Sequence, residues 1–308
     1  MTALIAVVMP PRFGAWRRFP SLASGASRLT WQECRAAADA VCCGMAQILM
    51  PLPDHDFDVT EVAVPWKVLT RAGHHVVFAT EAGATPACDP LLLSGVIFGA
   101  LGAAKEPKAF YAEMAATPGF QKPRRWDELV ASDYDALFLA GGHAPGMKQY
   151  LASTVLQEKV AQFWALERPV AAICHGTLVL ARTLGPDGKS VLHEHKTTCL
   201  PKYMERSAYF LTAWKLGRYY RTYPAYVEEE VRAALGDPTQ LERGPRVLSA
   251  RGTDSDDKPS FVVHDRKYLS GRWPGDSYRL AKDLVALMEL RSVDAASGMP
   301  PVTSSARS

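Results

Sequence analysis

The sequence predicts an α/β protein, a three-layer sandwich in which a mostly parallel sheet carries helices on both faces. Short apolar runs bounded by glycine or proline, such as residues 135–142 (DALFLAGG), have the length and composition of buried parallel strands. They alternate with segments whose apolar residues recur at helical spacing, for example residues 59–71. Alternation of this kind builds a parallel sheet with right-handed crossovers.

The first half of the expected domain contains four strands and four helices. Glycine or proline marks most of their ends, because neither residue continues a regular element easily. Strands are expected at residues 46–52, 75–80, 135–142 and 169–173, and helices at 59–71, 105–117, 155–166 and 177–184.

The second half is less regular. A short strand is possible at 196–200, after a turn that contains proline and glycine. Residues 246–251 and 261–270 have strand composition, and the second run could fold back at Asp265–Arg266. Helices are expected at residues 227–235 and 277–290, the latter closing the fold.

Both ends of the chain differ in composition from the middle. Residues 1–44 are rich in arginine and serine, as organelle transit peptides are, but we favour a translation start at Met45 or simple disorder as the explanation of the segment. Residues 291–308 are rich in serine, alanine and proline and are expected to be disordered. One α/β domain is therefore expected at residues 45–290.

Composition excludes several classes of function. The 308 residues include 35 basic and 32 acidic side chains, too even a balance to indicate nucleic-acid binding. No apolar stretch approaches the roughly 20 residues of a membrane span. The six cysteines form no CxxC pair, which favours a reducing compartment over a disulfide scaffold. We expect a cytoplasmic protein, with organelle targeting by residues 1–44 as the alternative.

The junction at Cys174-His175-Gly176 is the strongest functional signal. It joins the strand expected at 169–173 to the helix expected at 177–184. Such a strand-to-helix turn raises a side chain above the sheet edge, as in the nucleophile elbow of hydrolases. A helix N-terminus should also lower the thiol pKa from its usual value of about 8.5. The competing interpretation is an inert, buried core cysteine.

Four motifs together resemble one known family. DVTEVAVPW, RAGHHVVFATEAG, LFLAGGHAPG and VAAICHGTLVLA are similar to the ThiJ/PfpI superfamily, which has the flavodoxin-like fold of class I glutamine amidotransferases. The resemblance extends from about Met45 to Leu290. The Cys-His-Gly elbow and the long segment before the Gly-Gly strand resemble the larger branch, which contains stress-inducible chaperones with glyoxalase III or deglycase activity.

The resemblance implies a set of catalytic residues. Cys174 matches the nucleophile, and His175 could act as a general base. Glu61 occupies the position where the family places a carboxyl against the thiol, so its pKa should be raised by burial and by the thiolate. The alternative is that Glu61 is an ordinary glutamate in the first turn of a helix, with no catalytic role. Glu205 follows a threonine-rich segment at a plausible separation to orient His175, but an exposed helical glutamate fits equally well.

Backbone groups near the Gly-Gly motif are expected to bind substrate. Gly142, together with the backbone N–H of His175, would form an oxyanion hole, and neighbouring Gly141 and His143 would contact the substrate. No metal is expected. The one alternative, a site built from His193, His195 and Cys199, rests on spacing alone.

The resemblance implies a cofactor-independent cysteine enzyme of the glyoxalase III or deglycase type. Its substrate would be a small dicarbonyl such as methylglyoxal, its product a hydroxy acid, and its quaternary state the homodimer usual for the family. Neither a nucleic acid nor a membrane is expected as a partner. A hydrolase of amides or peptides and a non-catalytic, redox-sensing holdase chaperone are the alternatives. Glutamine amidotransferase activity is disfavoured because Ala172 stands where those enzymes have glycine.

Overall fold

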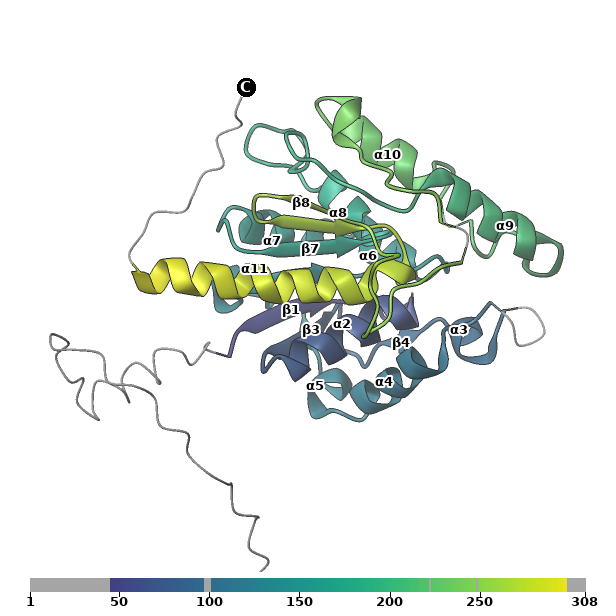
Figure 1. Ribbon diagram of the computed structural model, residues 1–308, viewed down its shortest axis with the longest axis horizontal. Coiled ribbons are helices and arrows are strands. Elements are labelled where there is room, and N and C mark those ends of the chain that lie inside the picture. Colours follow the sequence, from purple (N-terminus) through teal and green to yellow (C-terminus); the bar gives the residue numbers. More distant parts are fainter. Residues whose placement is uncertain (1–44, 97–100, 222, 248, 298–308) are drawn as a thin grey trace, which may run out of the picture. The chain divides into compact units, whose positions relative to one another are not determined.

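The central feature of the computed structural model is a seven-stranded sheet in the order β5-β3-β1-β6-β7-β9-β8 (Figure 1). All neighbouring strands are parallel except β8 and β9, which form an antiparallel pair. The structure describes residues 45–96, 101–221, 223–247 and 249–297. Residues 1–44, for which a transit peptide, a later start or disorder was expected, lie outside this part. The fold class predicted from the sequence is confirmed.

The strands are short and joined mostly by helices. The bounds of the strands are β1 Gln47–Pro51, β2 His55–Phe57, β3 His75–Thr80, β4 Ala87–Cys88, β5 Arg124–Arg125, β6 Ala136–Leu139, β7 Val170–Ile173, β8 Val262–Asp265 and β9 Tyr268–Gly271. The bounds of the helices are α2 Val59–Arg71, α3 Pro90–Ser94, α4 Lys105–Ala115, α5 Pro118–Gln121, α6 Met147–Ala152, α7 Thr154–Trp164, α8 Gly176–Arg182, α9 Lys202–Leu216, α10 Val227–Ala234 and α11 Ser277–Ser297.

The central strands are buried on both faces. Every residue of β6 (ALFL) and β7 (VAAI) is buried, and only the first residue of β1 (QILMP) is partly exposed. A parallel strand covered by helices on both sides must be apolar at every position, which explains these uninterrupted runs in the sequence.

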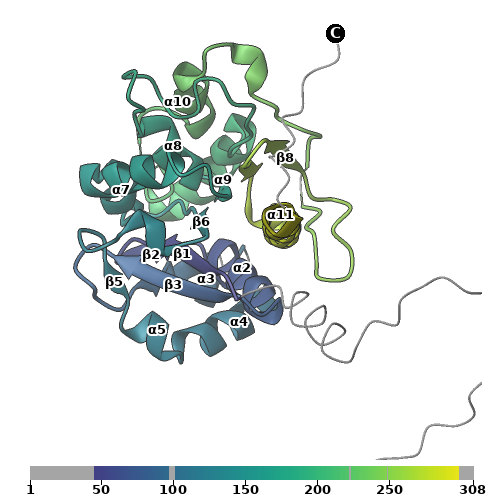
Figure 2. The ribbon, with the colours of Figure 1, turned by 90° about the vertical axis from the view of Figure 1, so that its left-hand side faces the viewer.

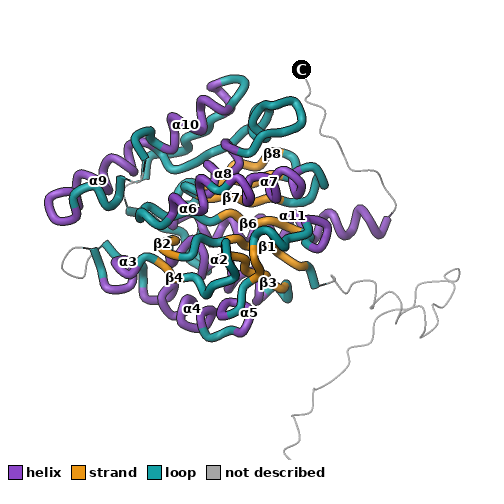
Figure 3. Tube along the Cα trace, turned by 180° about the vertical axis from the view of Figure 1, so that it is seen from behind, coloured by secondary structure: helices purple, strands orange, loops and turns teal. Residues whose placement is uncertain are grey.

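Helices cover both faces of the sheet. On one face α2 packs against α4 and α11, and on the other α8 packs against β6, β7, α6 and α7. Figure 2 shows α7 and α8 on one side of the strands and α11 on the other. Figure 3, from behind, shows α6, α7 and α8 in front of β6 and β7.

The strand order has a switch point between β1 and β6. From β1 the chain first adds β3 on one side of the sheet and later adds β6 on the other side. Open α/β sheets bind ligands at the carboxyl ends of the strands beside such a switch point.

The loop after β9 is fixed by a fully buried ion pair. Arg272 Nε lies 2.9 Å from Asp276 Oδ2, and both side chains have no exposed surface. Asp276 also accepts hydrogen bonds from the backbone N–H groups of Phe261 and Arg272, and Arg272 Nη1 donates to the Pro245 carbonyl at 2.7 Å. Each buried charge therefore has partners, as buried charges require.

Several expectations for the second half need correction. Residues 196–200 form no strand, since Thr197 makes only an isolated bridge to Leu241. The described residues of 246–251 form no strand either. The run at 261–270 does fold back, as the hairpin of β8 and β9, with Arg266 at a φ of +59° in its turn. Helix α11 continues past Leu290 to Ser297, into the tail expected to be disordered.

Helix α9 was not predicted as an element. It buries only Glu205 and Thr212, and leaves Phe210, Leu211 and Trp214 exposed, so its sequence lacks the apolar stripe of a core helix.

Within the described residues, no helix combines the length and the apolar character needed to cross a membrane.

Candidate active site

Cys174 lies in a strained turn directly after β7. Its φ of +58° is in the left-handed region, which non-glycine residues seldom adopt and which is typical of functional sites. The Cys174 N–H donates to the Gly271 carbonyl at 3.1 Å, and His175 occupies the N-cap position of α8 without a capping hydrogen bond from its side chain. The chain thus makes the strand-to-helix elbow predicted from the sequence, with the thiol fully buried.

Gly176 makes this elbow possible. A β-carbon at Gly176 would lie 2.2 Å from the Leu139 carbonyl oxygen and 2.7 Å from that of Ala140. Helix α8 therefore begins in direct contact with the end of β6, and only glycine permits the approach. This packing explains the third residue of the Cys-His-Gly motif.

Four hydrogen bonds that involve Asp58 and Gly141 fix Glu61 beside the elbow. The Asp58 side chain caps α2 by accepting from the Thr60 and Glu61 N–H groups, at 2.7 and 3.1 Å. The Asp58 N–H donates to the Gly141 carbonyl at 2.9 Å, and the Gly141 N–H donates to Glu61 Oε2 at 3.0 Å. The first turn of α2 is therefore joined to the loop after β6.

Gly141 lies where the three catalytic candidates meet. A β-carbon there would be 2.7 Å from Glu61 Oε2. It would also be 2.7 Å from the His175 backbone nitrogen and 3.0 Å from Cys174 Cβ. The predicted site residues Glu61, Cys174, His175 and Gly141 are thus brought together. Gly142 packs beside them, with its would-be β-carbon 2.7 Å from the Asp56 carbonyl oxygen.

Burial dominates the electrostatics of Glu61 and Cys174. Burial, and then the neighbouring Asp58 carboxyl, raise the pKa of Glu61 well above its ordinary value, which favours the protonated form of this carboxyl. Burial, and then the Glu61 and Asp58 carboxyls, also raise the pKa of Cys174, although the His175 backbone N–H opposes the effect. The expected lowering of the thiol pKa by the helix N-terminus was therefore wrong, because desolvation outweighs it.

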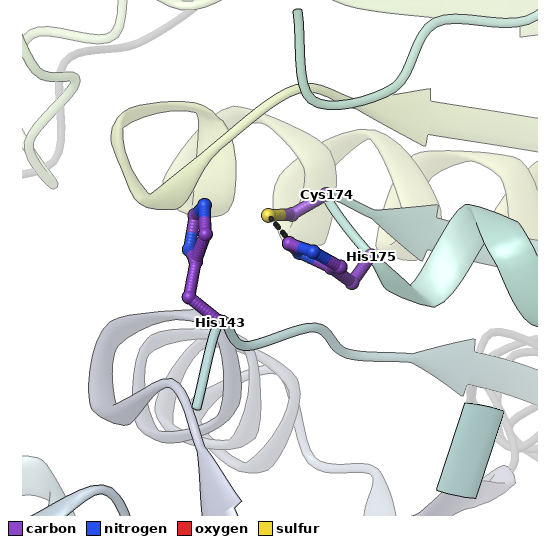
Figure 4. A group of neighbouring side chains, drawn as sticks. All are labelled: His143, Cys174 and His175. Atoms are coloured by element: carbon purple, nitrogen blue, oxygen red, sulfur yellow. Dashed lines mark hydrogen bonds between the residues drawn. The ribbon is translucent and has the colours of Figure 1, made fainter. Parts of the chain in front are cut away.

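His175 is positioned to take the thiol proton. Its Nδ1 lies 3.5 Å from Cys174 Sγ (Figure 4). Burial, followed by the positive charges of Arg182 and Arg221 and the neighbouring His143, lowers the pKa of His175 well below its ordinary value. The His143 and His175 rings pack edge to face with centroids 4.6 Å apart, and burial lowers the pKa of His143 to about 4. Both imidazoles are therefore neutral near pH 7 and able to accept a proton.

Glu205 was expected either to orient His175 or to be an exposed glutamate on a helix, and the structure shows neither arrangement. Its Oε1 accepts from Arg221 Nη1 at 2.9 Å and its Oε2 accepts from the Val227 N–H at 3.0 Å. The side chain is buried and closes the start of α10, so it is not an exposed glutamate. Because both oxygens are engaged with these groups, Glu205 does not orient His175 in this structure.

A cavity of about 270 Å³ adjoins the site at His143. Residues of α9 supply much of its apolar wall, while Tyr220 and Arg251 add polar groups. The Arg251 guanidinium lies 5.2 Å from the centroid of the Trp273 ring, which also lines the cavity. Apart from His143, these lining residues were not predicted from the sequence, because no motif links segments so far apart in the chain.

The described residues hold one group of three side chains close enough to share a metal ion. It consists of His143, Cys174 and His175, whose donor atoms all lie within 4.8 Å of one another. The alternative considered from the sequence is not such a group: His195 instead lies 3.4 Å from Asp265, and Cys199 donates weakly to the Leu200 carbonyl.

Comparison with known proteins identifies the family. A family model described as "ThiJ/PfpI family-like" matches residues 52–245, more than half of the chain. The chain belongs to the ThiJ/PfpI superfamily. An uncharacterized protein of Schizosaccharomyces pombe is 31% identical to this ThiJ/PfpI protein over 242 residues, which cover 76% of this chain and 80% of the relative. The resemblance inferred from the four sequence motifs is thereby confirmed.

Two further comparisons concern glyoxalases. A "Glutathione-independent glyoxalase" of Schizosaccharomyces pombe is 28% identical over 148 residues, which cover 45% of this ThiJ/PfpI protein and 56% of that relative. The crystal structure of glyoxalase III from Candida albicans has a TM-score of 0.56 at 19% identity, covering 79% of this chain and 97% of that one. At that identity the structural likeness is evidence of a shared fold only.

Proposed function

We propose that this protein is a glyoxalase III-type enzyme, which converts small dicarbonyls such as methylglyoxal to hydroxy acids without a cofactor. The observation that carries the proposal is the buried cluster of one thiol, one carboxyl with a raised pKa and one imidazole with a lowered pKa: Cys174, Glu61 and His175. Isomerisation of a dicarbonyl needs a nucleophile and groups that move protons between adjacent carbons. The relatives named glutathione-independent glyoxalases support the same reaction.

The first step follows from the raised pKa of the thiol. Because Cys174 is protonated at rest, His175 Nδ1 takes its proton as sulfur attacks the aldehyde carbon. The carbonyl oxygen then gains a proton, giving a hemithioacetal. The Glu61 carboxyl, whose raised pKa favours the protonated form, can supply it, and the backbone N–H groups of His175 and Gly142 are the proposed oxyanion donors. The Gly141 N–H is already engaged with Glu61.

The remaining steps move one proton and add one water. The Glu61 carboxylate, which gave up its proton in the first step, removes the proton from the former aldehyde carbon, while the protonated His175 imidazole supplies a proton to the neighbouring carbonyl oxygen, which gives an enediol. Glu61 returns its proton to the second carbon while the hydroxyl on the sulfur-bearing carbon loses its proton to His175, which produces a thioester of the hydroxy acid. Water then hydrolyses the thioester, releasing the hydroxy acid and restoring the thiol. No electrons leave the substrate, so the cycle needs neither an oxidant nor a cofactor.

The burial of Cys174 argues against the redox-sensor alternative. Sensor cysteines are usually exposed and have a low pKa, because the thiolate is the species that peroxide oxidises. Cys174 has no exposed surface, and its pKa is raised. The homodimer inferred from the family resemblance stays a prediction for this protein.

The test is lactate formation from methylglyoxal without added glutathione. We expect Cys174→Ser to abolish turnover, because a serine hydroxyl is a far weaker nucleophile than a thiol at neutral pH. Cys199→Ser is the matched control, since Cys199 is also a buried, free thiol but contacts none of the catalytic candidates in the hydrogen bonds described. Absence of lactate with the unmodified protein, or substantial lactate from Cys174→Ser, would overturn the proposal.

A further inference from the structure

Three potential metal donors meet at the carboxyl ends of two neighbouring strands. His143 follows β6, while Cys174 and His175 follow β7, and these strands are paired in parallel register. Their ends therefore lie side by side, and Figure 4 shows the His143 ring beside the Cys174 sulfur and the His175 ring. One donor atom from each side chain lies within 4.8 Å of the other two.

These separations resemble the edges of a tetrahedral zinc site. With Zn–S near 2.3 Å, Zn–N near 2.0–2.1 Å and tetrahedral angles, sulfur and nitrogen ligands are about 3.6 Å apart and two nitrogens about 3.3 Å. The distance from Cys174 Sγ to His175 Nδ1 is 3.5 Å, which already matches the first edge. The longest separation, 4.8 Å, requires a shift of roughly 1–1.5 Å, within reach of a rotation of the His143 ring.

The donor types are also those that zinc prefers. One thiolate and two imidazoles suit Zn²⁺ better than Mg²⁺ or Ca²⁺, which take oxygen ligands. Three protein ligands leave a fourth position for water or for the Glu61 carboxyl, which also contacts the thiol. His143 lines the cavity described above, so an ion in that cavity reaches this side chain directly.

We propose that His143, Cys174 and His175 form an inhibitory zinc site, in which the ion occupies the same thiol that attacks the substrate. On binding, the Cys174 thiol loses its proton to solvent and a Zn–S bond forms, with no change of oxidation state. Zinc then blocks the nucleophile until a chelator or a competing thiol removes it. The inhibition rests on the proposed glyoxalase function, whereas binding itself does not.

The experiment measures zinc binding without substrate. Zn²⁺ alone is titrated into the full chain by calorimetry, and alkylation of Cys174 by iodoacetamide is followed by peptide mass spectrometry with and without zinc. Resolution by peptide is necessary because the sequence also contains Cys34, Cys42 and Cys43. We expect zinc to slow Cys174 alkylation at least tenfold and excess EDTA to restore it.

Two histidine variants separate this site from general zinc affinity. His143→Ala should weaken the zinc protection of Cys174 at least tenfold, while Cys174 remains open to alkylation in zinc-free buffer. His264→Ala is the matched control, because His264 is exposed on β8 and pairs with Asp283. It should leave protection unchanged. If zinc fails to protect Cys174 from alkylation in both variants, the cause is unfolding or a nonspecific effect, and the proposed site is overturned. Full protection in His143→Ala, or no protection in the unmodified protein, would also overturn it.

The outcomes also separate the two proposals. If the protein binds zinc at Cys174 but forms no lactate, the proposal of a metal site stands and the proposed glyoxalase function fails. If it forms lactate but zinc does not protect Cys174, the proposed enzyme function stands and the proposal of a metal site fails. If both proposals are right, zinc should inhibit lactate formation over the same concentrations that protect Cys174.

Discussion

The substitution Gly141→Ala tests the geometry of the active site most directly. A single methyl group at this position would enter the space between the three catalytic candidates. Its carbon would lie 2.7 Å from both Glu61 Oε2 and the His175 backbone nitrogen, and 3.0 Å from Cys174 Cβ. The φ of Gly141 is not among the positive values, so alanine meets no backbone strain there and the effect is one of space alone.

The distance by which the neighbouring groups must move sets the size of the expected loss of activity. Ordinary contact begins near 3.4 Å, so Glu61 Oε2 and the His175 backbone nitrogen must each move by about 0.7 Å relative to the new methyl group. Because misplacement of reacting groups by about 1 Å can cost a factor of about 100 in rate, we expect kcat/KM to fall roughly 30- to 100-fold, equivalent to about 2–3 kcal/mol. Overpacking should also lower the free energy of unfolding by about 1–3 kcal/mol.

The assay combines lactate formation from methylglyoxal with the rate of Cys174 alkylation and with urea unfolding. Gly119→Ala is the matched control, because a β-carbon at Gly119 meets nothing within 4 Å and this glycine also lacks a positive φ. We expect that variant to keep full activity and unchanged or slightly higher stability. If Gly141→Ala keeps wild-type kcat/KM and alkylation, the catalytic groups do not depend on this close approach and the reasoning fails.

Other expected outcomes concern protonation, stability and the role of Glu205. Alkylation of Cys174 should accelerate as the pH rises above neutrality, because its raised pKa leaves little thiolate at pH 7; a rate independent of pH would mean a resting thiolate. Asp276→Asn should lower the free energy of unfolding in urea by about 3–5 kcal/mol, since it leaves Arg272 buried without a countercharge. Asp254→Asn, which breaks an exposed ion pair, should change it by less than about 1 kcal/mol, and equal effects would contradict the argument. Glu205→Gln should lower the melting temperature but leave Cys174 alkylation unchanged, and a large change in that rate would return Glu205 to the catalytic site.

The sequence by itself determined the central strands of the sheet, the first helix of the site and the elbow. Strands buried on both faces must be apolar throughout, so β6 and β7 could be recognised without knowledge of their partners. Helix α2 was predicted with its observed bounds, because its helical spacing and its ending near Gly73 are local signals; the cap at Asp58 was found only in the structure. The Cys-His-Gly motif likewise specified the turn, since its glycine is required by contact between α8 and the end of β6.

Only the tertiary structure decided the properties that depend on residues distant in the chain. Helix α9 has no clear apolar stripe, and its Glu205 is engaged by partners that no spacing rule connects with it. The direction of the thiol pKa depends on burial and on carboxyls from another helix, which outweigh the local effect of the α8 N-terminus. The approach of His143 to His175 follows from the pairing of β6 with β7 and from the loops that follow them. Local conformation can be predicted from residues that are neighbours in the sequence. The protonation, burial and contacts of a side chain depend instead on all the segments that pack around it in the fold.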